Sequence, residues 1–279
     1  MKTTFGLIGL LALLNTWSSA AVDPVSAGAR SLGMSGAGVM LTGQGPGAGN
    51  PAGLAVLSNL TLGLQYANYF MVPELGQGAF SVGLPAMTGA FGLEYTSLGN
   101  SYYRENQVCL SFGKTLGGKL RAGISLHYLM VRQPAGFENL SSISPSLGLQ
   151  VMPVDGLTIG FRLFNPAALN YRPEGYLKLP VIIQAGLGYK LGEEVLVCFE
   201  AEKEDHEKIK YCGGIEISWK NSLIARFGVS SGVFPCYSFG LGFQCRSLRI
   251  DLAATHHPVM GFSPVITLAQ TVGTIKKKS

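Results

Sequence analysis

Apolar and polar side chains alternate along most of this chain, in segments of roughly ten residues that run from near Leu60 to the C-terminal end. In one such run, the apolar positions are Leu179, Val181, Ile183, Ala185, Leu187 and Tyr189, and the polar or empty positions are Lys178, Gln184, Gly186, Gly188 and Lys190. Successive side chains on a β-strand point to opposite faces, so each segment predicts a strand with one apolar face. The chain is 47% hydrophobic, yet no apolar run after residue 20 is as long as a membrane-spanning helix. Together these features predict an all-β fold, a transmembrane antiparallel β-barrel.

The alternation predicts about fourteen strands, an even number as in bacterial single-chain barrels. They are expected near residues 60–70, 76–85, 88–97, 103–115, 119–131, 141–152, 156–165, 177–190, 194–203, 207–219, 222–230, 234–244, 247–256 and 262–272. Tight turns follow the even-numbered strands, whereas some connections after odd-numbered strands are longer, notably 132–140 and 165–176. Because such barrels have short periplasmic turns and longer outer loops, both termini are expected in the periplasm of a bacterial outer membrane.

The side chains of one hairpin suggest its register. With the turn at residues 204–206, the predicted pairs are Glu202 with Lys208, Glu200 with Lys210, Phe199 with Tyr211, and Cys198 with Cys212. Opposite charges and paired aromatic rings across neighbouring strands stabilise a sheet, which favours this register. It places Cys198 and Cys212 together in the lumen, where a disulfide and two free thiols both remain open, since a bridge between adjacent strands needs unusual geometry.

The first 21 residues are expected to be a secretory signal peptide. Lys2 supplies a positive charge, residues 5–14 are apolar, and residues 18–21 are small, as at a cleavage site. The alternative is an uncleaved anchor, but its apolar run of about ten residues is short of the roughly twenty that span a bilayer. The rest of the chain is expected to form one domain, in which residues 22–57 are a hatch or plug segment, residues 58–273 the barrel and residues 274–279 a basic tail.

The polar positions of the strands are expected to face the lumen. This inward set comprises Gln65, Glu94, Arg121, His127, Gln150, Arg162, Gln184, Glu200, Lys210, Glu216, Arg226, Arg249 and Asp251. Charges of both signs fit a wet or plugged interior, because isolated charges could not be left unpaired in lipid. Glycines between them indicate close approach of another backbone to the wall.

Residues 28–55 lack the alternation and are dense in glycine and alanine. Such a composition suits a compact segment threaded into a narrow lumen, and it is the source of the hatch prediction. The alternative is a disordered tail in the periplasm.

Two motifs in this segment resemble a known family. They are Ala29-Arg30-x-x-Gly33-Met34-x-Gly36-Ala37-x-Val39 and Asn50-Pro51-Ala52-Gly53-Leu54. The pattern resembles the N-terminal signature of the FadL-like outer-membrane barrels, especially their PorV/PorQ branch. The resemblance implies a fourteen-stranded barrel with an N-terminal hatch inside. In that case Arg30, Gly33, Gly36, Asn50, Pro51 and Gly53 would form the hatch motif, with Asn50 and Pro51 turning the hatch toward the first strand.

Three other motifs resemble chemical sites without meeting their requirements. Residues 228–232 match a nucleophile elbow followed by Asp251 and His256, but an elbow leads from a strand into a helix, and here a short loop leads to another strand. His256 and His257 are neighbours on a strand and point to opposite faces, with no ligand at metal-site spacing. The glycines of 43–49 lack the Lys-Ser/Thr of a phosphate loop. The sequence therefore predicts no enzyme, metal or cofactor.

The charge of the chain does not indicate nucleic acid as a partner. Only 13% of residues are charged, the net charge is +5, and the one basic cluster is the tail. The expected surroundings are the lipids of the outer membrane.

Two functions follow from the resemblance. The PorV/PorQ branch implies an accessory of surface-protein export, as in type IX secretion, which acts through contacts with secretion or surface proteins. The wider FadL-like family implies passive transport of hydrophobic small molecules past the hatch, with a possible sideways exit through the wall. An apolar pocket beside the hatch would favour transport, and a sealed, charged lumen would favour export. The polar inward set favours the export role.

Overall fold

The structure is a computed structural model that describes residues 28–43, 49–171, 179–205, 207–220, 222–232 and 234–273. The predicted signal peptide, the first residues of the hatch and the basic tail lie outside the described residues. In the described part of the chain, no helix has both the length and the apolar character needed to cross a bilayer.

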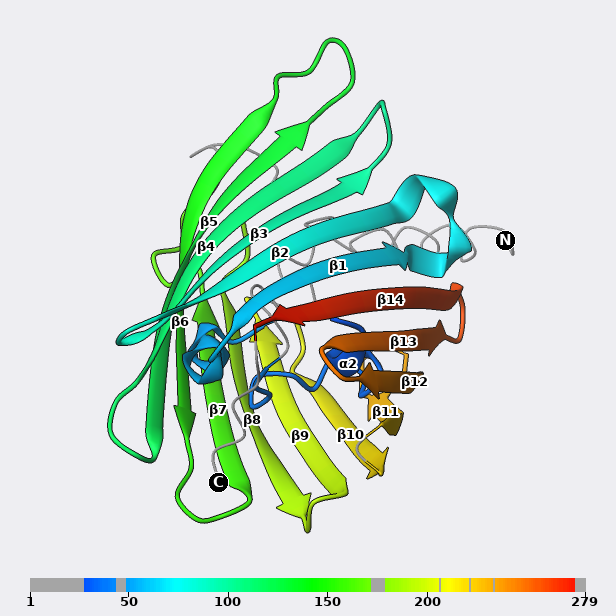
Figure 1. Cartoon of the computed structure of the whole chain (residues 1–279). Coiled ribbons are helices and arrows are strands. Elements are labelled where there is room, and N and C mark those ends of the chain that lie inside the picture. The colour runs from blue at the N-terminus through cyan, green and yellow to red at the C-terminus, as the bar shows by residue number, and fades with distance from the viewer. Residues whose placement is uncertain are drawn as a thin grey trace, which may run out of the picture.

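Fourteen antiparallel strands form one closed barrel (Figure 1). They are β1 (Leu60–Asn68), β2 (Gly76–Ala86), β3 (Gly89–Gly99), β4 (Arg104–Thr115), β5 (Leu120–Arg132), β6 (Leu140–Val151), β7 (Leu157–Phe164), β8 (Ile182–Leu191), β9 (Val195–Glu204), β10 (Lys210–Trp219), β11 (Leu223–Ser230), β12 (Cys236–Cys245), β13 (Leu248–His257) and β14 (Gly261–Val272). Each strand pairs with its neighbours in sequence, and pairing of β1 with β14 from Leu60–Val272 to Ala67–Val265 closes the barrel. The predicted fold class and strand number are confirmed.

The two ends of the barrel differ in their connections. The connections after the even-numbered strands are short: residues 87–88 form one of the shortest, and residues 152–156 form the longest. At the opposite end, the connection after β1 contains the 3-10 helices η2 (Tyr69–Met71) and η3 (Pro73–Leu75), and the one after β7 covers residues 165–181. We call these the turn end and the loop end. The expectation that the turn end faces the periplasm stays a prediction.

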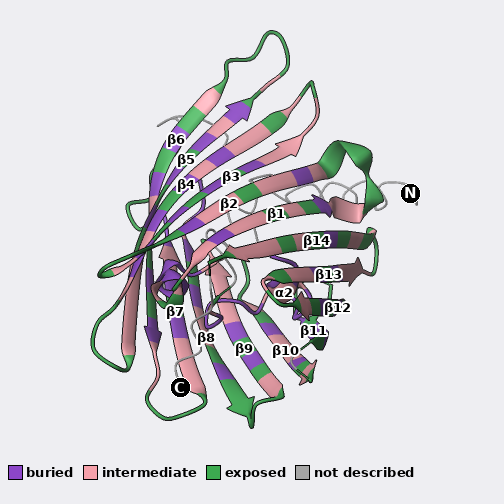
Figure 2. Cartoon of the chain, in the orientation of Figure 1, coloured by how far each residue is buried: buried purple, intermediate pink, exposed green. Residues whose placement is uncertain are grey.

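The strands present apolar side chains to the outside of the barrel. In β11, exposed and buried residues alternate strictly, with Phe227 and Val229 exposed and Arg226 and Ser230 buried. Figure 2 shows exposed and buried stretches along the strands all round the barrel. In water this arrangement would expose many large apolar side chains, whereas in lipid it places them in their preferred surroundings.

Strand β8 begins later than its alternation suggests. The expected strand over 177–190 starts at Ile182, and Leu179, expected on the apolar outer face, is only 3% exposed and packs inward against Leu129, Phe164 and Ile182. The reason is that Leu179 precedes the strand, so the two-residue period does not set its direction.

The predicted register of the hairpin between β9 and β10 is wrong by two residues. Lys210 pairs with Glu202, Cys212 with Glu200, and Gly214 with Cys198. A shift of two residues keeps every side chain on its predicted face, and the connection is correspondingly longer. Lys210 still forms an ion pair, with its Nζ 3.5 Å from Glu202 Oε1. The rings of Phe199 and Tyr211 still stack, at 6.1 Å between centroids, but as diagonal neighbours.

All five cysteines are free thiols. The two-residue shift removes the direct pairing of Cys198 with Cys212 on which the possible disulfide depended. Both side chains are buried and pack against hatch residues that include Met34 and Val39. They therefore act as small apolar fillers between hatch and wall.

The described part of the hatch, residues 28–43 and 49–57, crosses the lumen. Its short helix α2 (Ala29–Leu32) contacts β12, β13 and β14, and this side is visible in Figure 1. Its 3-10 helix η1 (Pro51–Val56) contacts β3, β4, β5 and β6 on another side of the ring of strands. The barrel thus encloses the segment.

Candidate functional site

A chain of charged side chains fastens α2 to the wall. Arg30 donates to both oxygens of Glu216, at 2.8 Å from Nε and 2.6 Å from Nη2. Glu216 also accepts from Arg226 Nε at 2.7 Å, Arg226 Nη1 lies 2.8 Å from Asp251, and Asp251 accepts from Arg249 Nε at 2.6 Å. Arg30 of the hatch motif and four predicted lumen residues therefore meet in one network. Because the guanidinium of Arg30 donates one hydrogen bond to each oxygen of Glu216, it holds α2 in one orientation against the wall.

A second carboxylate binds the hatch backbone. Glu200 is 1% exposed, and its Oε2 accepts from the N–H groups of Gly38 and Val39 at 2.7 and 2.8 Å. Its Oε1 accepts from Gln184 Nε2 at 3.0 Å. The hatch turns tightly here, and no other group of a described residue is hydrogen-bonded to these two donors. Glu200 thus supplies partners that a turn inside a barrel would otherwise lack.

Asn50 is hydrogen-bonded both to another part of the hatch and to the wall. Its Nδ2 lies 2.8 Å from the carbonyl oxygen of Val39 and 3.1 Å from those of Leu149 and Phe161. Its Oδ1 accepts from Ala52 N, which caps η1, and Pro51 follows as the first residue of that helix. The chain continues from η1 to β1, and the turning role of Asn50 and Pro51 stays a prediction.

Glycines bring the two backbones into direct contact. A Cβ atom on Gly148 would stand 2.0 Å from Asn50 Oδ1, one on Gly160 2.4 Å from the carbonyl oxygen of Val39, and one on Gly228 2.4 Å from the carbonyl carbon of Met34. These distances are far inside van der Waals contact, so no other residue fits.

The glycines of the hatch motif have distinct roles. Gly33 lies against Gly240 of the wall, and Gly53 lies against the carbonyl oxygen of Leu41, where a Cβ atom would be 2.9 Å away. Gly36 has a φ of +94°, a conformation that side chains disfavour. Close packing and backbone geometry thus explain the motif.

The other predicted lumen residues bind the wall or line a cavity. Arg162 is 3% exposed and donates to Ser146 Oγ at 3.3 Å and to Gln184 Oε1 at 3.1 Å. Glu94 is buried and accepts from Thr96 Oγ1 at 3.4 Å, Lys210 pairs with Glu202, and Arg121 lines the cavity described below.

The wall between β6 and β7 is paired only in part. Ladder pairs run from Val151–Ile159 to Ser146–Phe164, and in the described part of the chain residues 140–145 of β6 have no strand partner on that side. Among the described residues, two hydrogen bonds join this stretch to the connection after β7: Asn165 N donates to the carbonyl oxygen of Pro145 at 2.9 Å, and Ser142 Oγ donates to that of Asn170 at 3.2 Å.

An apolar cluster lies inside the lumen next to this interruption. It consists of Leu129, Phe164, Leu179 and Ile182, with Tyr171 packed against them. Arg162 lies nearer the turn end on β7, with its guanidinium carbon 5.7 Å from the centroid of the Phe164 ring. Apolar side chains, each at most 4% exposed, thus fill the lumen next to the partly paired stretch of the wall.

Sequence reasoning missed the side chain that shapes this region. Asn165 has a φ of +54°, and its Nδ2 donates to the carbonyl oxygens of Leu169 and Leu179 at 2.9 and 3.0 Å. The only signal in the sequence is Asn165-Pro166, which favours a turn directly after a strand.

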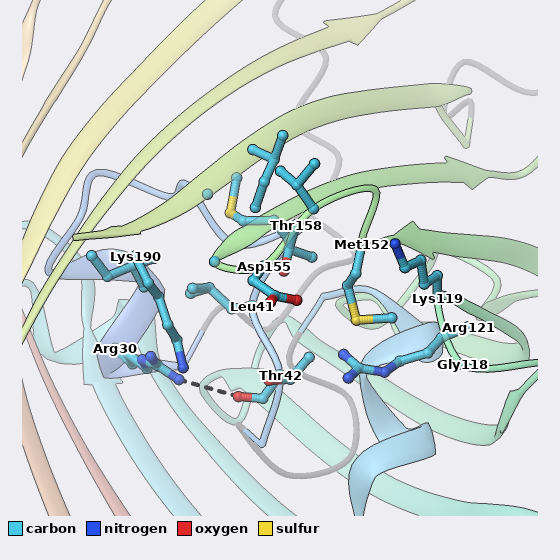
Figure 3. A pocket seen from close by; sticks show the side chains of 16 residues that line it. Arg30, Leu41, Thr42, Gly118, Lys119, Arg121, Met152, Asp155, Thr158 and Lys190 are labelled. Carbon is cyan, nitrogen blue, oxygen red and sulfur yellow. Dashed lines mark hydrogen bonds between the residues drawn. The ribbon is translucent and has the colours of Figure 1, made fainter. Parts of the chain in front are cut away.

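A cavity of about 490 Å³ lies between the hatch and the strands at the turn end (Figure 3). Its lining residues are Arg30, Met40, Leu41, Thr42, Gly118, Lys119, Arg121, Met152, Val154, Asp155, Gly156, Leu157, Thr158, Gly188, Lys190 and Leu196. Arg30 Nη1 donates to the carbonyl oxygen of Thr42 at 3.1 Å across the hatch side of this space.

The elbow-like motif does not assemble a catalytic triad. Ser230 ends β11, and a loop leads from it to another strand. Asp251 is bound to Arg226 and Arg249 on the inner face of β13, whereas His256, an odd number of residues further on, lies on the outer face against Phe262. Among the described residues, no group of three or more His, Cys, Asp or Glu side chains could hold a metal ion.

The fold is similar to that of solved outer-membrane proteins. The Pseudomonas putida toluene transporter TodX is 12% identical with a TM-score of 0.68, over 90% of this chain and 100% of that one. CymD, a monoaromatic hydrocarbon channel, is 14% identical with a TM-score of 0.63, over 91% and 100%. A FadL homologue from Pseudomonas aeruginosa is 12% identical with a TM-score of 0.62, over 87% and 97%. No protein-family model and no curated protein matches the sequence. At these identities, the shared property is the fold.

Proposed function

We propose that this protein is a passive channel for hydrophobic small molecules in the bacterial outer membrane. The observation that carries the proposal is the closed fourteen-strand barrel with a packed hatch, a fold it shares with TodX and CymD over about nine tenths of its length. The apolar outer face supports a place in the membrane.

The lumen suggests a route for such molecules. The turn-end half is occupied by the hatch, so a straight passage is blocked. At the loop end, Leu129, Phe164 and Ile182 form a closed apolar cluster beside residues 140–145 of β6, which have no strand partner among the described residues on that side. A hydrophobic solute that enters from the loop end would contact this cluster and leave sideways into the lipid past residues 140–145.

Uptake of radiolabelled toluene by intact cells tests the proposal. Cells with an outer leaflet of lipopolysaccharide are required, because toluene crosses a plain phospholipid bilayer unaided. We expect cells that produce the protein to take up toluene faster than cells with an empty vector. Equal uptake, together with no binding of toluene or of a long-chain fatty acid to the purified protein, would contradict the proposal.

The orientation is part of the same proposal, with the turn end in the periplasm. A Phe137→Cys variant carries a thiol in the connection between β5 and β6, and Val154→Cys carries one in the turn between β6 and β7. With the half-buried Cys236 and the exposed Cys245 replaced by serine, a membrane-impermeant maleimide should label the Phe137→Cys variant in intact cells and the Val154→Cys variant only after the cells are opened. The reverse pattern would invert the orientation.

The second candidate is the export accessory. The observation in its favour is that the turn-end half of the lumen is sealed by a charged network, as expected of a barrel that works through contacts rather than flow. The similar structures give it no support, because they are transporters and channels. Crosslinking in outer membranes followed by purification tests it: recovery of no secretion or surface protein would count against it, and secretion genes beside its own would favour it.

A further inference from the structure

The turn-end cavity carries more positive than negative charge. Four cationic side chains line it, Arg30, Lys119, Arg121 and Lys190, against the single carboxylate of Asp155. In Figure 3 the labelled basic side chains approach the space from both sides. Like charges that share a concave site with low-dielectric walls raise its potential and attract anions.

Two of these cations are already engaged. Arg30 is bound to Glu216 and to the carbonyl oxygen of Thr42, and Lys119 Nζ donates to the carbonyl oxygen of Pro153 at 3.0 Å. The side chains of Arg121 and Lys190, in contrast, form no hydrogen bond or ion pair with any residue that the structure describes. Among the described lining residues, Asp155 is the one carboxylate at the cavity with these two cations.

The remainder of the lining is largely apolar. Met40 and Leu41 come from the hatch, Met152 and Leu157 from the ends of β6 and β7, and Leu196 from β9. The thioether side chains of methionine adapt to ligands of varied shape. A volume of about 490 Å³ lies within the range of sites for small organic molecules.

We propose that this cavity binds a small organic anion with an apolar body. Arg121 and Lys190 would hold the anionic group, and Met40, Leu41 and Leu196 would contact the apolar part. The site lies on the turn-end side of the hatch, away from the apolar cluster at the loop end, and it goes beyond the proposed channel because a neutral hydrocarbon would not use these cations. Since Met40 and Leu41 belong to the hatch, the bound anion would rest directly on it.

Calorimetric titration of the purified full chain in a non-ionic detergent tests the site. The probes are 4-butylbenzoate and its neutral analogue 4-butylbenzyl alcohol, with inorganic phosphate as a third. We expect 4-butylbenzoate to bind at least about tenfold more tightly than either of the others, since only it has both a charge and an apolar body. Equal affinity of the neutral analogue would overturn the role of the cations, and equal affinity of phosphate would overturn the role of the apolar lining.

A charge-matched pair of variants locates the site. Arg121→Gln/Lys190→Gln should weaken binding of 4-butylbenzoate at least about tenfold. Lys114→Gln/Lys203→Gln removes the same charge outside the cavity and should leave binding unchanged. Equal affinities in both variants would overturn the assignment. If the first variant fails to fold, the comparison of the three probes on the unmodified protein still tests whether the protein binds an anion with an apolar body. Toluene uptake is measured separately, so failure of the channel and failure of this site are distinguishable.

Discussion

The two halves of the lumen are filled in different ways. In the turn-end half, the hatch touches the wall backbone to backbone, through glycines such as Gly160 and Gly228, and is fixed by buried charges. In the loop-end half, side chains such as Leu129 and Phe164 occupy the space, and two hydrogen bonds replace the strand ladder beside β6. In the first arrangement a change of shape meets backbone atoms at once, whereas in the second, among the described residues, two hydrogen bonds join the stretches on which a ladder would lie. The contrast teaches that one barrel combines a closely packed seal, formed by the hatch, with a seam at residues 140–145 of β6 that lacks a strand ladder among the described residues.

Replacing Glu216 by alanine should have the largest effect on the seal. Its carboxylate lies between Arg30 and Arg226, so its loss leaves two buried guanidinium groups without their shared partner. Removal of one member of a buried pair costs about 3–5 kcal/mol. We expect a matching fall in the free energy of unfolding in detergent, measured by urea titration, and greater sensitivity of cells to a large polar antibiotic. Glu202→Ala, at a half-exposed pair, is the control. Equal losses in both variants would show that the network does not fix the hatch.

Replacing Gly228 by valine should have the next largest effect. The new Cβ would overlap Met34, which lies in the hatch, so the backbones must move apart. Overpacking of this kind costs about 1–3 kcal/mol. Thermal unfolding in detergent should report the loss. Gly78→Val is the matched control, since a Cβ atom there meets nothing within 4 Å. If both valines were tolerated equally, the close contact would be unimportant for stability.

A crosslink between β6 and the connection after β7 tests the seam in the loop-end half, at residues 140–145. Ser142 Oγ donates to the backbone carbonyl oxygen of Asn170, so the two segments lie side by side, and we expect Ser142→Cys/Asn170→Cys, with Cys236 and Cys245 replaced by serine, to form a disulfide on oxidation. We expect oxidised cells to take up toluene about tenfold more slowly, equivalent to about 1.4 kcal/mol in the barrier, and reduction to restore uptake.

The control for the seam lies in the paired part of the same wall. Leu147→Cys/Leu163→Cys joins direct partners on β6 and β7, and its oxidation should leave uptake unchanged. Slower uptake with this pair too, or none with the first, would contradict a sideways route at residues 140–145.

The smallest effect is expected at the pair of Lys210 and Glu202. Both side chains are partly exposed, and their closest approach is 3.5 Å. Exposed pairs contribute about 0–1 kcal/mol, so Lys210→Gln should change the urea midpoint little, and less still in high salt. A loss as large as that of Glu216→Ala would mean that charge in the loop-end half also holds the barrel together.

Much of the fold was predictable because side chains two residues apart on a strand lie on the same face of the sheet, so the alternation shows which of them face the lumen. It identified fourteen strands, and the N-terminal motif identified the segment inside them. The register of β9 and β10 was not predictable to the residue. Lys208 and Lys210 alternate in the same way, so either could face Glu202 without moving any side chain to the wrong face.

The loop-end region was less accessible to such reasoning. Leu179 reads as a strand residue, yet it precedes the strand, and its carbonyl oxygen is held by Asn165, fourteen residues earlier, whose Nδ2 donates to it. Arg121 was predicted to face the lumen, but neither the interrupted ladder nor the meeting of Arg121 with Lys190 at one cavity could be predicted, because both depend on which connections lie side by side in space.

The glycine contacts also constrain how the molecule is assembled. Met34 touches Gly214 and Gly228 on one side, and Pro51 touches Gly113 and Gly123 on the other, with no room for a side chain in between. A segment fitted this closely cannot slide along a finished wall past its side chains. These glycines belong to β10 and β11 on one side and to β4 and β5 on the other, so the hatch links two pairs of strands that share no hydrogen-bonded ladder with each other, and the ring of strands and the segment inside it stabilise each other.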